Sequence, residues 1–507
     1  ANAQGREERR GAGGTSPEMM PITRLIRHIA IALSIALLPA AALRAQPSSD
    51  GELQTLLDRA LKANPRILAA KCQVEQALDS HEELLGFFDP RLYAAGGKSE
   101  RARSVPGGTS WTSLTGNAHE VTAGVEVPVR PGAYVTAGAA ERFLFESSSY
   151  GYDHLYQSLL GVRLRVPLMR DRGFAQHELG RARALAEYNG AVSDLLAAMQ
   201  ALRHDIEKAY VDAYSKLASH EVSKRALERF RVLHGQAREL SRLKVVPAYQ
   251  VFPAEMELAL RLEEEEQARQ AYANSLIALQ KLIGDNQPVV LAHGAERLVE
   301  VAAQLGPLAP VDPDAALERR GTYLRVLNRI EAARADLAQA TDDLQPDLSL
   351  NASVTVRGED PDDLVGRDAI VDDSLLGGEV VVVWERPLMH RAANSRISRH
   401  RARIAELKQN IETERTALTA ELQTAAETYA SLVGRMKLLV QAKEAAQQTV
   451  SAEDERFRLG EGTSRNALDA QKDLTTALNR QATAAADILR ALADYRYAAG
   501  YADAEQP

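Results

Sequence analysis

The chain has 507 residues, of which 45% are hydrophobic and 26% charged, so it is long enough for several domains or one large elongated domain. Its formal net charge of -8 gives no electrostatic reason to expect a nucleic-acid partner. The single cysteine, Cys72, excludes an intramolecular disulfide framework and a cysteine-based zinc cluster.

The N-terminal region carries a secretory signal pattern. Basic residues precede an apolar run from Ile29 to Leu43, and small residues suited to cleavage lie at Ala42 and Ala45. The apolar run is short for a membrane span, and a membrane anchor is the alternative interpretation. We assign residues 20–45 to a signal peptide and residues 1–19 to a non-native leader, either translated upstream sequence or a mis-set start.

The rest of the chain is internally duplicated. A shift of 256 residues aligns Leu61 and Pro90 with Leu317 and Pro346, and each half is predicted to run helix, strands, long helix, break and return helix. The first repeat is expected at residues 46–300, with strands at about 91–168 and a helical hairpin at 174–284. The second is expected at 301–507, with strands at about 347–387 and a helical hairpin at 391–500.

The segments between the helices alternate in polarity like strands. Asp347–Val356 and Leu159–Leu168 each place apolar side chains on one face, which suits either a half-buried soluble strand or a lipid-facing barrel strand. A tight turn at Arg130-Pro131-Gly132, long polar loops elsewhere and aromatic residues near the segment ends favour the barrel. The acidic segment Glu359–Asp373 lacks EF-hand spacing, so we interpret it as a solvated external loop.

The predicted helices are unusually long. Phe174–Arg242 and Arg391–Phe457 would each extend about 100 Å at ~1.5 Å per residue, and return helices are expected at Ala248–Ile283 and Ser464–Ala499. The last of these carries a seam with a 3.5-residue period that includes Gln471, which indicates coiled-coil packing. A soluble coiled-coil rod would explain the helices equally well, but it would not explain the strands between them.

Three stretches resemble the TolC-like outer-membrane efflux proteins, and the resemblance extends over about Leu53–Gly500. ALKANPRILAAKCQVEQA (Ala60–Ala77) is similar to that family's opening helix, and LQPDLSL (Leu344–Leu350) to its helix-to-strand junction. RFRLGEGTSRNALDAQKDLTTAL (Arg456–Leu478) is similar to the tip of its second helical hairpin. The order and spacing of these stretches carry the resemblance more than any one of them.

The resemblance implies an α+β membrane protein with a trimeric outer-membrane β-barrel continuous with a long periplasmic α-helical barrel. It implies the outer-membrane channel of a tripartite efflux or type I secretion system, a passive export conduit that needs no cofactor. The implied partners are two further copies of the chain, a periplasmic adaptor (membrane fusion) protein, an inner-membrane pump and outer-membrane lipid, with no nucleic acid. Drug, metal and protein export share such a conduit, so the exported substrate and the type of pump stay open.

Two other classes of function are weighed against this one. A soluble periplasmic coiled-coil protein with a structural or interaction role is the main alternative. An enzyme is not expected, because the sequence has no zinc-protease, nucleophile-elbow or phosphate-loop motif. The histidines lack metal-ligand spacing, so no metal site is expected either.

The sequence offers three sets of candidate site residues, of which the resemblance carries over the first two. Those matching the adaptor-docking tip are Phe457, Arg458, Leu459, Gly460, Thr463 and Ser464. Asn466 and Asp469 fall at the periplasmic gate, and Asn466 stands where the family often has an aspartate. Arg396, Arg399 and Arg403 form a basic ring facing the lumen, a contact with lipid headgroups or a solvated charged face. The helix turn at the tip has an alternative reading too, in which glycine only supplies a positive φ.

The first half departs from the family pattern at two places. An extra strand pair, Glu120–Val129 and Tyr134–Phe145, either joins the barrel wall, giving six strands per chain and eighteen per trimer, or forms a flap. The first hairpin tip has no glycine at Lys244 and is expected to break at Pro247.

Overall fold

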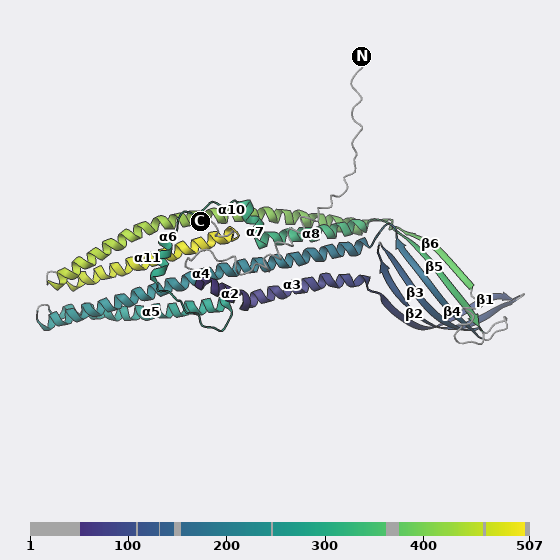
Figure 1. Cartoon of the computed structure of the whole chain (residues 1–507), viewed down its shortest axis with the longest axis horizontal. Coiled ribbons are helices and arrows are strands. Elements are labelled where there is room, and N and C mark those ends of the chain that lie inside the picture. Colours follow the sequence, from purple (N-terminus) through teal and green to yellow (C-terminus); the bar gives the residue numbers. More distant parts are fainter. Residues whose placement is uncertain are drawn as a thin grey trace, which may run out of the picture. The chain divides into compact units, whose positions relative to one another are not determined.

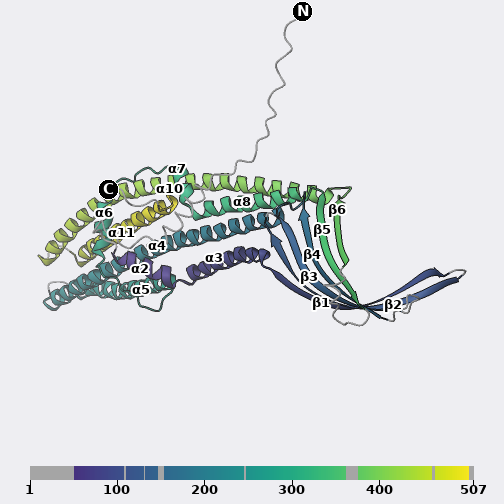
Figure 2. The same ribbon diagram turned by 45° about the vertical axis from the view of Figure 1, so that its right-hand side comes forward.

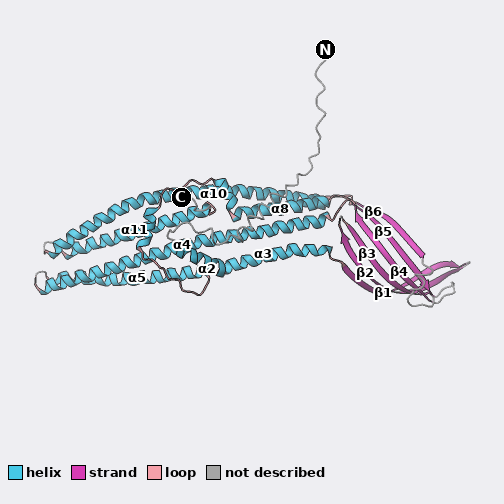
Figure 3. Cartoon of the chain, viewed as in Figure 1, coloured by secondary structure: helices cyan, strands magenta, loops and turns pink. Residues whose placement is uncertain are grey.

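The computed structural model describes residues 51–107, 110–130, 132–146, 154–244, 247–360, 375–459 and 463–501. The chain divides at Gly51, and the elements described below belong to the unit Glu52–Pro507. Its strands lie together in one sheet and its helices run from that sheet side by side (Figures 1 and 3). The expected leader and signal peptide, residues 1–45, lie outside the described residues.

The first half alternates helices with four strands. Its elements are α2 (Gly51–Ala63), α3 (Pro65–Glu83), the 3-10 helix η1 (Leu84–Phe88), β1 (Arg91–Gly107), β2 (Ser110–Val129), β3 (Ala133–Glu146), β4 (His154–Pro167), α4 (Ala175–Arg242), the 3-10 helix η2 (Ala248–Gln250), α5 (Val251–Ile283) and α6 (Glu296–Gln304). The helix α4 has 68 residues and begins one residue after the start expected from the sequence.

The second half repeats this order with two strands. Its elements are α7 (Pro313–Arg319), α8 (Gly321–Asp342), β5 (Asp347–Asp360), β6 (Leu375–Glu385), α10 (Arg391–Arg458) and α11 (Ser464–Ala498). The helix α10 also has 68 residues, so the two halves have long helices of equal length.

The strands form a single antiparallel sheet in the order β1-β2-β3-β4-β5-β6. The extra pair, β2 and β3, therefore lies within the sheet, between β1 and β4. Strand β2 pairs with β3 only as far as Gly116, whereas β1 and β2 stay paired out to Gly107 and Ser110. The β1–β2 ribbon consequently projects past the other strands (Figure 2).

Alanine is the most frequent buried hydrophobic residue among the described residues. Ala467, Ala485 and Ala486 are fully buried, and the clusters in which they lie combine residues of α4, α10 and α11. Small side chains let helices approach closely, which explains how a chain with 5% aromatic residues buries its long helices.

The duplication is visible in how each return helix ends. Gly284 follows α5 and Gly500 follows α11, with φ angles of 81° and 70°. A Cβ on Gly284 would lie 2.9 Å from Pro65, and a Cβ on Gly500 would lie 3.0 Å from Arg319. Both positions need a left-handed residue with no side chain, so glycine is required at equivalent places in the two repeats.

Among the described residues, no helix is both long enough and apolar enough to cross a membrane.

Candidate functional site

One face of the sheet is apolar from edge to edge. The cross-strand register places Leu92, Val125, Ala137, Val162, Val354 and Gly378 in one row. The next row contains Ala94, Ala123, Ala139, Leu160, Val356 and Leu376. Leu92 is 82% exposed and Leu376 75% exposed, so no described part of the chain covers this face at its two edge strands. We call it the apolar face.

Aromatic residues lie on the apolar face near both of its ends. Trp384 is 63% exposed and pairs with Leu348 at the end where the strands meet the helices. At the opposite end the rings of Phe143 and Tyr156 lie 4.3 Å apart on paired residues. An apolar band bounded by aromatic residues at both edges is the arrangement of a strand wall in lipid.

The opposite face of the sheet is polar, and we call it the polar face. One of its rows contains Arg91, Glu126, Thr136, Arg163, Ser353 and Glu379. In another row Arg142 binds Glu120 at 3.0 Å and the amide of Gln157 donates to Glu359 at 2.8 Å. A polar face opposite an apolar one is what a water-filled barrel interior requires.

The second candidate region is the turn between α10 and α11. Helix α10 is followed by Leu459, whose N–H donates to the carbonyl of Glu455 at 3.0 Å. Helix α11 is capped by Thr463, whose hydroxyl accepts from the N–H of Asn466 at 3.3 Å. A threonine N-cap of this kind satisfies one of the free N–H groups of the first turn. Gly460 lies outside the described residues.

The predicted docking residues have different surroundings. Phe457 is 4% exposed and packs with Ala467, Leu468 and residues of α4 and α5, so it holds the tip together rather than presenting a surface. Leu459 is 61% exposed. Arg458 is the last residue of α10 and Ser464 the first of α11.

The predicted gate residues lie on the first turns of α11. The main-chain N–H of Asn466 is taken up by the cap, and the side chain of Asp469 is 69% exposed, with Arg465 4.0 Å away. An exposed carboxylate on one chain becomes a ring of carboxylates when copies surround an axis.

The first hairpin tip exposes a set of apolar residues that sequence reasoning missed. Lys244 takes a φ of 61°, the left-handed conformation for which glycine is the usual choice. After it, Tyr249, Phe252 and Met256 are each more than 60% exposed on η2 and α5. Their spacing of three and four residues puts them on one side of the helix, a signal that the sequence contained.

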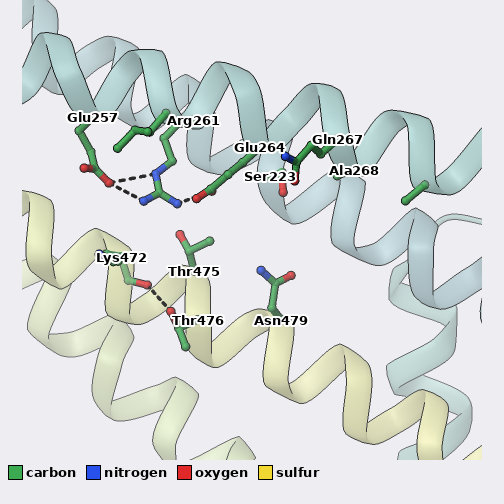
Figure 4. A pocket seen from close by; sticks show the side chains of 12 residues that line it. Ser223, Glu257, Arg261, Glu264, Gln267, Ala268, Lys472, Thr475, Thr476 and Asn479 are labelled. Atoms are coloured by element: carbon green, nitrogen blue, oxygen red, sulfur yellow. Dashed lines mark hydrogen bonds and ion pairs between the residues drawn. The ribbon is translucent and has the colours of Figure 1, made fainter.

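Polar side chains lie between α5 and α11, farther along these helices from the two tips. Arg261 on α5, with 8% of its side chain exposed, bonds to Glu257 and Glu264 and lies over the ring of Phe230 at 5.1 Å (Figure 4). It borders a cavity of about 580 Å³ between α5 and α11, into which Thr475 and Asn479 also point (Figure 4). Around this cavity the α5–α11 contact is polar, whereas nearer the tips Ala254 of α5 lies in one hydrophobic cluster with Ala467 and Leu468 of α11.

Within the second hairpin, the half-buried Asp454 of α10 pairs with the buried Gln471 of α11. The amide of Gln471 donates to one carboxylate oxygen at 3.1 Å. The other carboxylate oxygen, Oδ1, and the amide oxygen of Gln471 are buried without a hydrogen-bond partner. Burial raises the pKa of Asp454, while the bond from Gln471 and the charge of Arg229 lower it.

Arg396, Arg399 and Arg403 lie near the start of α10, the helix that follows β6. Arg396 binds Asp343, at the end of α8, at 2.8 Å. Arg403 binds Glu406 on its own helix at 2.6 Å, and all three arginines are exposed. Within this chain, Arg396 therefore joins α10 to α8.

In the part of the chain that the structure describes, histidine, cysteine, aspartate and glutamate side chains form no group of three or more arranged to hold a metal ion.

Comparison with known proteins gives a family-model match over part of the chain and matches in fold over most of it. Residues 313–500 match the family model described as outer membrane efflux protein. No curated protein matches the sequence significantly.

Several solved structures share the fold over most of the chain. The outer-membrane channel OprN has 17% sequence identity and a TM-score of 0.64, over 89% of this chain and 90% of that chain. CusC has 14% identity and a TM-score of 0.66, over 91% and 96%. The MtrE outer membrane channel of Neisseria gonorrhoeae, in its open state, has 15% identity and a TM-score of 0.62, over 89% of each chain. The expected fold class is thereby confirmed.

Proposed function

We propose that this chain is a TolC-like outer-membrane efflux protein and the outer-membrane conduit of a tripartite efflux or type I secretion system. Residues 313–500 match the outer membrane efflux protein family model, and about nine-tenths of the chain shares the fold of solved outer-membrane channels. It is an outer-membrane efflux channel with a periplasmic helical extension. It moves its cargo passively and carries out no reaction of its own.

The observation that carries this proposal is the two-faced sheet. Apolar rows cross all six strands on one face and charged rows cross them on the other. A soluble coiled-coil protein, the alternative function, has no use for an apolar face whose Leu92 and Leu376 are at least three-quarters exposed. A wall with lipid on one side and water on the other uses both faces.

The sheet also supports assembly as a homotrimer. Among the described strands, the edge strands β1 and β6 each pair on one side only. Lipid does not accept unpaired strand edges, because their N–H and C=O groups have no partner there. Threefold closure joins β6 of each copy to β1 of the next. Since the sheet has an even number of strands, that junction is antiparallel like those inside the chain.

The two hairpin tips are the proposed contact with a periplasmic adaptor protein. Leu459 at the second tip and Tyr249, Phe252 and Met256 at the first are exposed apolar side chains at the ends of helical hairpins. Helical hairpins of a partner bind such surfaces through apolar anchors at helical spacing. An inner-membrane pump behind the adaptor would supply the energy for export.

The proposed gate lies beside the second tip. Copies of Asp469 around the threefold axis would form a carboxylate ring, which favours cations. Asn466, one turn earlier, adds no charge, so the ring is less acidic than it would be with an aspartate at both positions. Arg396, Arg399 and Arg403 are all exposed and are proposed as a basic ring in the lumen, in which Arg396 and Arg403 are also paired with Asp343 and Glu406.

Opposite faces of one strand provide the test. Val354 lies on the apolar face and its neighbour Ser353 on the polar face. Arginine near the middle of a lipid-facing strand costs about 2–4 kcal/mol of membrane insertion. We expect Val354→Arg to reduce strongly the amount of protein in outer-membrane fractions, whereas Ser353→Arg leaves it close to wild type. Equal effects of the two variants would contradict a lipid-facing wall.

A further inference from the structure

The strand pair β2–β3 decides how wide the exit of the conduit is. We infer that this hairpin is part of the barrel wall, so that three copies close an eighteen-stranded barrel; the inference rests on the proposed outer-membrane function. Without the hairpin, β1, β4, β5 and β6 of three copies would close with twelve strands. Removing it would leave β1 beside β4 in antiparallel orientation, so the chain topology allows either wall.

The first argument is the continuity of both faces through the hairpin. Val125 on β2 and Ala137 on β3 lie in the apolar row that joins Leu92 on β1 to Val162 on β4. On the polar face, Glu126 and Thr136 continue the row from Arg91 to Arg163. A flap has no reason to match its neighbours on both faces, whereas a wall strand must match them.

The second argument is the packing of the β2–β3 turn. Gly132, with a φ of 125°, lies against the backbone of Gly173 in the connection from β4 to α4, where a Cβ on Gly132 would be 2.4 Å from the Cα of Gly173. The contact therefore allows no side chain at Gly132. The β2–β3 turn therefore packs against the connection from β4 to α4, where the strands meet the helices.

Aromatic and charged contacts hold the residues on either side of this turn. The ring of Tyr134 lies 5.1 Å from that of Phe174, which is 1% exposed, and 6.2 Å from that of Phe87. The guanidinium of Arg130 lies 4.8 Å from the centre of the Phe88 ring and 3.4 Å from Glu178 of α4. The hairpin is thus fixed to η1 on one side and to the start of α4 on the other, so it cannot swing out as a flap.

The added strands change the bore of the exit. The diameter of a closed barrel grows roughly in proportion to its strand number, so eighteen strands give a lumen about one and a half times as wide as twelve. Barrels of 16–18 strands leave an open aqueous channel between their walls. The wide exit would take bulky cargo without a constriction at the outer membrane.

Site-directed fluorescence tests the wall directly in the assembled full chain. Single cysteines are introduced at Val125 and at Glu126, adjacent residues on opposite faces of β2, in a Cys72→Ser background because Cys72 is exposed. Each is labelled with bimane in membranes and quenched either by spin-labelled lipid or by iodide. The same labels at Val354 and Ser353 on β5 form the control pair.

The wall predicts that Val125 is quenched several-fold more by lipid than by iodide and that Glu126 shows the reverse, as Val354 and Ser353 do. The eighteen-stranded wall is contradicted if iodide quenches the labels at Val125 and Glu126 equally while the labels at Val354 and Ser353 still differ. That result would not contradict the proposed outer-membrane function. When the β5 pair does not alternate either, the proposed function fails and the wall fails with it.

Discussion

The hydroxyl end of Tyr93 fills the space in which Gly124 would carry a side chain: a Cβ built on Gly124 would lie 2.6 Å from the phenol oxygen. The two residues are partners on β1 and β2, and the same oxygen would lie 2.9 Å from a Cβ on Gly138 of β3. The row continues through Gly161 on β4. One aromatic ring on the polar face therefore covers two strands that have no side chains of their own at this level.

This relationship predicts that Gly124→Ala damages assembly. A methyl group at this position would also approach the carbonyl oxygen of Ala137 to 2.7 Å, a backbone atom that cannot move aside cheaply. Overpacking of this kind typically costs about 1–3 kcal/mol. We expect less trimer that resists SDS at room temperature, measured by gel mobility before and after heating.

The control for that variant is Gly97→Ala. Gly97 lies on β1, on the same polar face as Tyr93 and Gly124. A Cβ on Gly97 would have no other atom within 4 Å. It should leave the trimer band unchanged. Equal loss in the two variants would mean that any alanine in these strands is harmful, and the Tyr93 contact would then explain nothing.

Docking at the second tip predicts that Leu459→Glu weakens adaptor binding. Full burial of a leucine contributes roughly 1.5–3 kcal/mol, so its loss should reduce affinity about tenfold or more. The measurement is photo-crosslinking to the adaptor in cells together with export of the cargo.

Leu438→Glu serves as its control. Leu438 is on α10, the helix that Leu459 follows, and is 66% exposed against 61% for Leu459, but it lies 21 residues earlier in the chain. Crosslinking should persist in this variant. Unchanged crosslinking and export in Leu459→Glu would remove that residue from the proposed contact.

The cap at Thr463 predicts a local effect at the start of α11. Thr463→Ala should cost about 1 kcal/mol and Thr463→Ser much less, because serine keeps the accepting oxygen. Hydrogen exchange of the first-turn amides reports this opening. Thr476→Ala, which removes a bond only to a carbonyl in the middle of the same helix, should leave those amides as protected as before.

The pair Asp454–Gln471 predicts a dependence on pH. Because burial raises the pKa of Asp454 in the folded chain, the folded state binds its proton more readily than the unfolded state does. The free energy of unfolding should therefore fall as pH rises through the folded pKa, and it should recover as pH is lowered toward ~3.9, the ordinary value for aspartate.

Asp454→Asn tests the sign of that effect. Asparagine is neutral and can both accept from Gln471 and donate to its partnerless amide oxygen. The tip should gain about 1 kcal/mol at neutral pH, the usual net value of one hydrogen bond. Its local opening, followed by hydrogen exchange at pH 5 and pH 8, should become less dependent on pH than in the wild type. A tip that loses stability at both pH values would contradict a raised pKa.

The parts of the fold that depend on local pattern were predictable from the sequence. The proline-free run after Leu388 and the glycines near Gly460 predict one long helix and a return helix, and α10 and α11 lie there. The seam of α11 is buried, including Gln471 at 3% exposure, because a 3.5-residue period places its members on one side of the helix. Cross-strand rows also follow from alternation once the strands are paired.

Contacts between residues that are far apart in the sequence could not be predicted, because they depend on which faces of the helices and strands pack together. Phe457 matches a docking motif in the sequence, yet it is buried because α10 turns that side toward α4 and α5. Arg396 lies near the start of a helix, where its positive charge opposes the helix dipole, and its partner Asp343 is 53 residues away. No local pattern reports such a pairing. Strand β1 carries too many charges and glycines to stand out by alternation, and the sheet stabilises it through β2.

The central claim is that the chain is a trimeric conduit of the outer membrane. Fractionation of cells that produce the full chain, followed by gel analysis with and without heating, tests this most directly. The expected result is a trimer in the outer-membrane fraction that dissociates to monomer only on heating. Recovery of the chain as a soluble periplasmic rod would contradict the claim.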